Sequence, residues 1–106
     1  MNAITEALIE QAVSLLAAAA PRATVILFGS CARRDANSAS DADFLVVEPE
    51  LTARREEMVR LRDALRPLRI PVDVIAVSRA DFDRWRSIPG TLIYEAAREG
   101  KVCYAA

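Results

Sequence analysis

The sequence predicts an α/β or α+β fold, with one mixed sheet of three to four strands and flanking helices. Short β-branched and aromatic runs, typical of buried strands, alternate with longer segments whose apolar residues recur every three or four positions. The three apolar strands have to share one sheet, which satisfies their backbone groups, and helices must cover at least one face. With 106 residues, the chain is expected to form a single domain over residues 1–106.

The expected elements follow one another without repeats or low-complexity tracts. In order, they are a helix over residues 4–20, a strand over 24–28, a short helix over 30–34, a strand over 43–47, a helix over 51–65, a strand over 70–77, a helix beginning near 79, a helix over 90–98 and a short edge strand over 101–105.

The N-terminal elements are marked by their ends as well as by their spacing. Apolar residues recur at helical intervals over residues 4–20, and Pro21 ends that helix. The β-branched run 24–28 ends at Gly29, and Ser30 can cap the short helix that follows.

The later elements alternate in the same way. The apolar run 43–47 is closed by the turn sequence "EPE". The helix over 51–65 carries Leu51, Met58, Leu61 and Leu65 on one face. Pro71 lies at the start of the third strand, where a missing N–H is tolerated.

The C-terminal part is expected to hold two helices and an edge strand. Ser78 can cap the helix that begins near residue 79, and Gly100 stops the helix over 90–98. Four large apolar residues of this part are expected in the core or at its border; they are Trp85, Leu92, Ile93 and Tyr94. The alternative is a hydrophobic contact with a partner.

Composition excludes several classes of function. The net charge of −1 provides no basic field, so we do not expect direct binding to nucleic acid. The absence of histidine excludes a Ser-His-Asp triad, a Cys-His pair and histidine-based zinc sites. Cys31 and Cys103 lack metal or C-x-x-C spacing, and no secretory signal or membrane span is expected, which indicates reduced thiols in a cytoplasmic protein. Carboxylates or a bound metal must therefore carry any chemistry.

Two aspartates stand one residue apart at the start of the second strand, in "SDADFLVV". Strand side chains alternate, so Asp41 and Asp43 project from the same side, with Cα atoms about 6.6 Å apart. Adjacent carboxylates repel one another, and a shared Mg²⁺ ion removes that penalty. The alternative is that they are turn and cap residues.

A third aspartate, Asp73, interrupts the apolar run "PVDVIAV". A carboxylate buried there without a partner would be costly. Beside Asp41 and Asp43 it would complete a cluster able to hold two metal ions; the alternative is a surface aspartate on a half-exposed strand.

The Gly29-Ser30 pair supplies a phosphate-binding element. Glycine after a strand allows close approach of the backbone to a ligand, and the next helix presents free N–H groups. Followed ten residues later by D-x-D, with a lone strand aspartate downstream, this pair is a strong signal for phosphate binding.

At these residues the chain resembles a known family. The stretch "GSCARRDANSASDADFLVV" is similar to the G-S-x10-D-x-D motif of minimal nucleotidyltransferases, which belong to the polymerase-β-like nucleotidyltransferase superfamily. The similarity is greatest to the MNT antitoxins of HEPN/MNT toxin–antitoxin pairs, and the C-terminal "IYEAAREGKVCYA" resembles the family's usual ending. The resemblance implies a polymerase-β-like core, Mg²⁺, a nucleoside triphosphate such as ATP, and transfer of AMP to a tyrosine of a HEPN toxin.

The resemblance also implies roles for individual positions. Gly29 and Ser30 match the phosphate-binding pair. Asp41 and Asp43 match the metal-binding pair, and Asp73 matches the third, catalytic carboxylate.

Three further positions fall within the motif. Arg33 matches the arginine that follows the Gly-Ser pair, and Ser40 matches the serine before the first aspartate; both are expected to bind nucleotide. The alternatives are a solvated loop charge for Arg33 and a simple turn residue for Ser40. Arg34 stands where the family commonly has glycine, which departs from the pattern.

Two other functions remain open at this point. The chain could silence a HEPN toxin by binding alone, with vestigial carboxylates. It could also transfer a nucleotide to a small molecule or an RNA end, although relatives of that kind carry an additional acceptor-binding domain.

Overall fold

The computed structural model describes residues 5–29 and 42–106. Its helices are α1 (Glu6–Ala19), α3 (Arg54–Ala64), the 3-10 turn η1 (Arg66–Leu68), α4 (Arg79–Trp85) and α5 (Leu92–Glu99). Its strands are β1 (Thr24–Phe28), β2 (Ala42–Glu48), β3 (Val72–Ser78) and β4 (Lys101–Ala105). The short helix expected over residues 30–34 lies outside the described residues.

Hydroxyl side chains cap the N-termini of three helices. The Thr5 hydroxyl accepts from the N–H of Leu8 at 3.2 Å. The hydroxyl of Ser78 accepts from Asp81 N–H at 3.1 Å, and that of Thr91 from Tyr94 N–H at 3.1 Å. Each bond satisfies an N–H group that has no partner inside its helix, which is why α1, α4 and α5 begin at these residues.

Several elements begin two or three residues later than expected, and β3 and α3 show the physical reasons. The strand expected over 70–77 begins at Val72, because Arg69 has a left-handed φ of 54° and Pro71 has no N–H. The helix expected over 51–65 begins at Arg54, and Leu51 packs against the core from the preceding loop. The prediction included Leu51 in the helix because its position matches the helical spacing of apolar residues, but Leu51 lies in the loop before α3.

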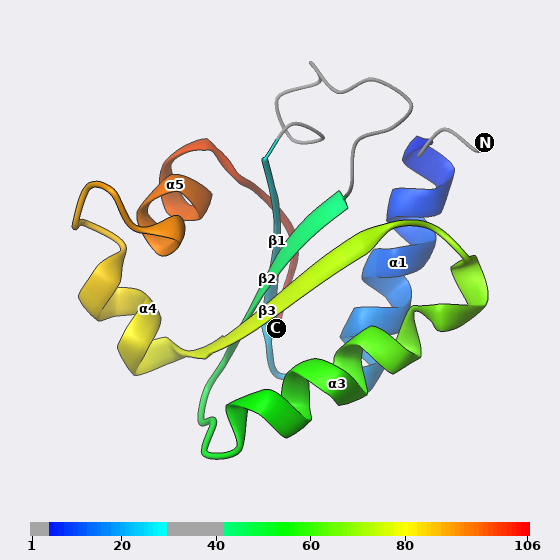
Figure 1. Ribbon diagram of the computed structural model, residues 1–106, viewed down its shortest axis with the longest axis horizontal. Coiled ribbons are helices and arrows are strands. Elements are labelled where there is room, and N and C mark those ends of the chain that lie inside the picture. The colour runs from blue at the N-terminus through cyan, green and yellow to red at the C-terminus, as the bar shows by residue number, and fades with distance from the viewer. Residues whose placement is uncertain (1–4, 30–41) are drawn as a thin grey trace.

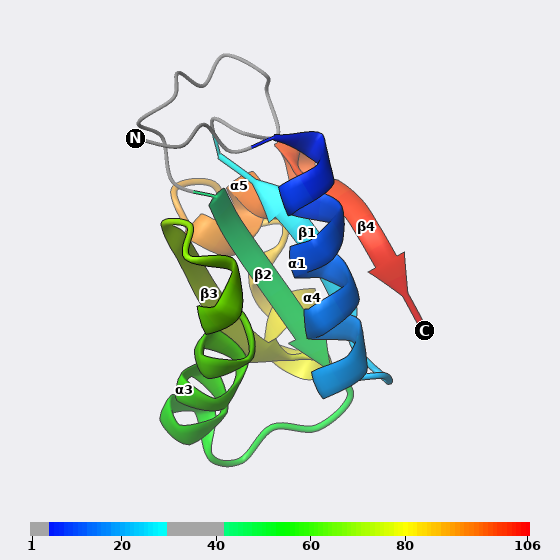
Figure 2. The ribbon, with the colours of Figure 1, turned by 90° about the vertical axis from the view of Figure 1, so that its right-hand side faces the viewer.

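The four strands form one mixed sheet in the order β3-β2-β1-β4. β1 is antiparallel to both neighbours, and β2 is parallel to β3. α1 and α3 cover one face of the sheet, and α4 and α5 cover the other (Figures 1 and 2). The expected fold class, an α/β or α+β arrangement with a mixed sheet and flanking helices, is confirmed.

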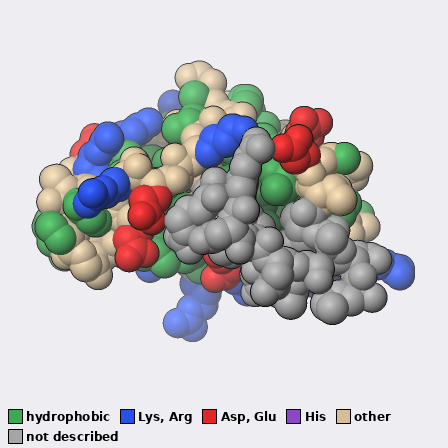
Figure 3. Space-filling view, turned by 90° about the horizontal axis from the view of Figure 1, so that it is seen from above, with side chains coloured by type: hydrophobic (Ala, Val, Ile, Leu, Met, Phe, Trp, Pro, Cys, Tyr) green, Lys and Arg blue, Asp and Glu red, His purple; other side chains and the backbone are tan. Residues whose placement is uncertain are grey.

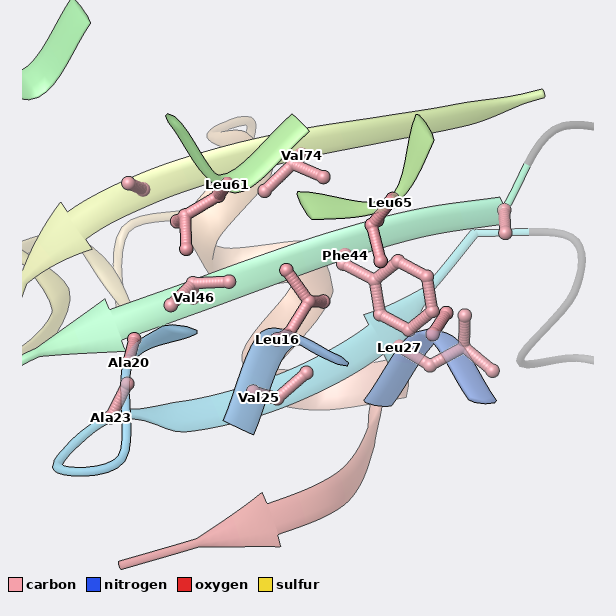
Figure 4. Packing of buried hydrophobic residues seen from close by; sticks show 13 residues of the cluster. Leu16, Ala20, Ala23, Val25, Leu27, Phe44, Val46, Leu61, Leu65 and Val74 are labelled. Atoms are coloured by element: carbon pink, nitrogen blue, oxygen red, sulfur yellow. The ribbon is translucent and has the colours of Figure 1, made fainter. Parts of the chain in front are cut away.

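Alternating strand residues supply two hydrophobic cores. The first core lies between the sheet and α1 and α3, and includes Leu16, Val25, Phe44, Leu61 and Val74 (Figure 4). The second core lies against α4 and α5; its buried members are Ile26, Phe28, Leu45, Val47, Val77, Phe82 and Ala96. Because both faces are covered, β2 is almost entirely apolar after Asp43.

The expectation of a position in the core or at its border is wrong for two residues. Trp85 and Leu92 are 40% and 42% exposed, whereas Ile93 packs against the second core. Helices as short as α4 and α5 bury only part of one side, and these two residues lie outside the part that meets the sheet. None of the helices in the described part of the chain is long and apolar enough to cross a membrane.

Candidate active site

One end of the sheet brings together the termini of three strands. β1 is antiparallel to β2, and β2 is parallel to β3, so the end of β1 meets the starts of the other two. At this end, Phe28 is the register partner of Asp43, and Asp43 is the register partner of Asp73. In Figure 1 it is the upper end of the sheet.

Asp43 and Asp73 lie side by side on neighbouring strands. Register partners of a sheet are about 4.8 Å apart and point to the same face, here that of the second core, which Leu45 and Val77 share. The side chain of Asp73 is 52% exposed, and Asp43 is partly buried. The structure therefore brings together two of the three carboxylates singled out by the sequence, both within reach of solvent.

Gly29 makes room for the carboxylate of Asp43. Its φ is +79°, a conformation that L side chains rarely adopt. A Cβ atom at this position would lie 2.5 Å from Oδ2 of Asp43, so any side chain would displace that carboxylate. The sequence predicts that Gly29 admits a ligand close to the backbone; in the structure its missing side chain also admits Asp43.

Arg62 of α3 reaches the carboxylate of Asp73. Its Nη2 lies 3.4 Å from Oδ1 of Asp73, and its side chain is 51% exposed. β3 is an edge strand, which lets a helix on the other face send a side chain to Asp73. Nothing in the sequence singles out Arg62 among the arginines of α3, because its approach to Asp73 depends on how the helix packs.

The other predicted site residues cannot be placed. Ser30, Arg33, Ser40 and Asp41 lie outside the described residues. Within residues 5–29 and 42–106, no three or more Asp, Glu, His or Cys side chains are close enough together to hold a metal ion. The described part of the candidate site is thus the pair Asp43 and Asp73 with Gly29.

This pair has the chemistry of a site for a hard divalent cation. Two carboxylates from adjacent strands present oxygen ligands on one side of the sheet, and oxygen is what Mg²⁺ prefers. The Arg62 guanidinium offsets part of their charge through a long, half-exposed contact that can be exchanged at low cost. The residues present therefore fit a magnesium ion.

The surface around this end carries charges of both signs. Figure 3 looks onto it and shows acidic and basic side chains interspersed with apolar ones over the described part of the face. The described part of this face shows no broad area of one sign of charge.

A second carboxylate pair lies at the opposite end of β2. Burial, followed by hydrogen bonding with Glu57 and repulsion by it, raises the pKa of Glu48 to about 7. Hydrogen bonds from Arg60, at 2.7 and 2.8 Å, and from Glu48 lower the pKa of Glu57 to about 2. Glu48 therefore tends to hold a proton that Glu57 accepts, while Arg60 binds Glu57 through two parallel bonds.

This pair predicts a pH-dependent stability. The folded state binds the Glu48 proton more tightly than the unfolded state, so its contribution is complete below about pH 4.5 and is lost as pH rises toward 7. Glu57 has the opposite effect, and its contribution is lost as pH falls from about 4.5 toward 2. A glutamine at position 48 imitates the protonated acid, so Glu48→Gln should raise the Tm at about pH 8 and change it little near pH 4.5.

The measurement is thermal unfolding across this pH range, with Glu50→Gln as the control. Glu50 is exposed and only two residues away, so the control removes the same charge without the buried contact. Equal Tm changes for the two variants at all pH values would contradict the assignment.

Comparisons with known proteins agree with this fold. The model of the nucleotidyltransferase domain family matches residues 9–100. A candidate nucleotidyltransferase from Sulfolobus solfataricus has a similar structure, with a TM-score of 0.55 and 24% identity over 93% of this chain and 78% of that one. A toxin–antitoxin structure with AMP-PNP aligns with a TM-score of 0.59 and 24% identity, over 92% of this chain and 73% of that one. A search of curated proteins gives no match.

The family match spans β1, β2 and β3, and so includes Gly29, Asp43 and Asp73. The two structural neighbours share the arrangement of sheet and helices. The family's chemistry is nucleotidyl transfer. This chain belongs to the nucleotidyltransferase domain family and is a nucleotidyltransferase.

Proposed function

We propose that this protein is an antitoxin that transfers AMP from ATP, with Mg²⁺, to a tyrosine hydroxyl of a HEPN-type toxin. The observation that carries the proposal is the placement of Asp43 beside Asp73, with Gly29 against the Asp43 carboxylate, in a chain of the nucleotidyltransferase family. Two carboxylates on one face of a sheet give such a chain its metal ligands.

Each residue of the motif has a part in the reaction. Asp41, Asp43 and Asp73 would hold two magnesium ions. When bound, these ions neutralise charge on the triphosphate and favour ionisation of the acceptor hydroxyl. The backbone N–H groups of Gly29 and Ser30 would bind the departing pyrophosphate.

Three side chains complete the reaction. Arg33 would hold the pyrophosphate and Ser40 would contact the nucleotide.

In the reaction, the acceptor oxygen forms a bond to the α-phosphorus, the bond from that phosphorus to the bridging oxygen breaks, and pyrophosphate leaves. Asp73 would take the proton of the acceptor hydroxyl, since it lies at the open edge of the sheet and is half exposed.

The acceptor is proposed to be a second protein because of one structural neighbour. A toxin–antitoxin structure with AMP-PNP, an analogue of ATP, has the same fold. The competing proposal is an antitoxin that silences its toxin by binding alone.

The test is the intact mass of the protein encoded next to this one, taken as the acceptor. It is incubated with this protein, Mg²⁺ and each of the four nucleoside triphosphates in turn, and the Asp41→Asn/Asp43→Asn double variant serves as the control. A gain of one or more AMP units with ATP, absent in the control, is the expected result.

Other outcomes separate the alternatives. A stable complex with no mass gain would favour silencing by binding. Labelled nucleotide transferred to added RNA, and not to protein, would favour an RNA acceptor. A gain with a different nucleoside monophosphate would correct the choice of nucleotide.

A further inference from the structure

A hollow of about 170 Å³ lies on the face of the sheet that α4 and α5 cover. Its floor is apolar and comes from three strands, with Ile26 of β1, Val47 of β2 and Val102 of β4. Its rim carries the guanidinium groups of Arg79 and Arg86, so we call it the two-arginine pocket. Nothing in the proposed nucleotidyl transfer uses this pocket.

Both arginines are held over one buried ring. The guanidinium carbons of Arg79 and Arg86 lie 5.6 and 5.0 Å from the ring centre of Phe82, whose side chain is only 4% exposed. Positions 79, 82 and 86 fall three and four residues apart, which places them on one side of α4 and its C-cap. Stacking on a fixed ring orients the two cations without consuming their N–H donors.

The positive charge of the pocket is poorly compensated. Arg79 makes a 4.0 Å ion pair with Asp83 and a 3.4 Å hydrogen bond to the hydroxyl of Thr24. Arg86 makes no ion pair within the described part of the chain. The described residues that line the pocket include two arginines and no acidic residue, so an anion would be attracted there.

The size of the pocket selects the kind of anion. Sites for drug-sized ligands and cofactors occupy about 300–1,000 Å³, so this pocket is too small for a nucleotide. An acidic side chain fits better, because its methylene groups can lie on the apolar floor while its carboxylate bonds the guanidinium fork. We infer that the two-arginine pocket receives a glutamate side chain of a partner protein.

The pocket and the candidate active site lie on different parts of β1. The pocket is lined by Thr24 and Ile26, whereas Phe28, the register partner of Asp43, lies two residues beyond Ile26, about 7 Å further along the strand. A change in the pocket should therefore weaken binding of the partner without altering how the carboxylates bind nucleotide. The inference rests on the proposed function in one respect: the proposed function identifies the toxin as the partner protein that supplies the glutamate.

The first experiment needs no partner. The ligand is blocked glutamate, which is acetylated at its α-amino group and amidated at its α-carboxyl group, so that only the side-chain carboxylate is charged. It is titrated into the wild-type protein, and the NMR chemical shifts of the side chains of Arg79 and Arg86 and of the backbone of Ala96 are followed. We expect saturable shifts with a dissociation constant on the order of 1 mM, typical of a single small group. Blocked glutamine and inorganic phosphate serve as matched probes.

Comparison of the three probes separates the result that supports the inference from those that overturn it. Shifts with glutamate and not with glutamine, lost in Arg86→Gln and kept in Arg84→Gln, are the expected result. Arg84 lies on the same helix and is exposed outside the pocket, so that variant removes equal charge. No saturable shift with glutamate, an equal shift with glutamine, or binding of phosphate alone would overturn the inference.

The second experiment uses the toxin complex. Arg86→Gln should weaken binding of the toxin about tenfold, the effect expected for loss of one charge-assisted contact, and Arg84→Gln should not. Nucleotide binding should be the same in all three proteins. If the wild type binds no toxin, the proposed function fails while the glutamate titration still decides the inference. If the toxin binds Arg86→Gln as tightly as wild type, the pocket is not its docking point.

Discussion

Asp43→Asn is expected to lower the rate of nucleotidyl transfer on the order of 10²–10³-fold while leaving the fold intact. Asparagine has the shape of aspartate and lacks its charge, so it cannot neutralise a divalent cation as a carboxylate does. Metal-assisted charge stabilisation contributes several kcal/mol to a transition state, and each 1.36 kcal/mol is a factor of ten in rate. The measurement is the rate at which AMP is added to the acceptor protein.

The Tm of this variant shows whether a loss of activity comes from a loss of folding. Asparagine keeps the shape of aspartate at position 43, so a folded variant with a strongly reduced rate is the expected result. Asp81→Asn, an exposed aspartate in the first turn of α4, is the matched control and should keep full activity. Wild-type rates for Asp43→Asn would remove this carboxylate from the catalytic site.

Gly29→Ala should reduce both stability and activity, for two separable reasons. Its φ of +79° costs an L residue about 1–2 kcal/mol, which lowers the free energy of unfolding. The new Cβ would also lie 2.5 Å from Oδ2 of Asp43 and would push that carboxylate away. A displacement of about 1 Å in a catalytic group can reduce a rate about 10²-fold, so we expect a loss of roughly that size.

Gly90 provides a control with the same strain and no contact. Its φ is +89°, and a Cβ there would meet no atom within 4 Å. Gly90→Ala should therefore lose a similar free energy of unfolding, measured in urea, and keep the wild-type rate of transfer. Equal losses of activity in both variants would mean that backbone strain alone, and not the position of Asp43, accounts for the effect.

The sequence by itself determined the elements and the chemistry to look for. Strand β1 begins and ends at the residues that the apolar run 24–28 marks, because glycine and turn residues interrupt such runs sharply. Because the sequence contains no histidine, any catalysis has to depend on carboxylates or a bound metal. Asp43 and Asp73 stand out in the sequence because each opens or interrupts an otherwise apolar strand.

Only the tertiary structure decided how distant parts of the chain meet. The parallel register of β2 and β3 makes Asp43 and Asp73 neighbours, and a shift by one residue would turn one of them to the opposite face. The approach of Arg62 to Asp73 depends on how α3 packs against an edge strand.

The packing of α4 likewise depends partly on local sequence and partly on tertiary contacts. Spacing along the helix places Arg79, Phe82 and Arg86 on one side, but only docking against the sheet buries the ring and leaves a hollow beneath the guanidinium groups. The same docking leaves Trp85 and Leu92 exposed, although both are as apolar as core residues. Local sequence determines which backbone conformation a segment prefers, whereas the position of each side chain depends on contacts between segments far apart in the chain.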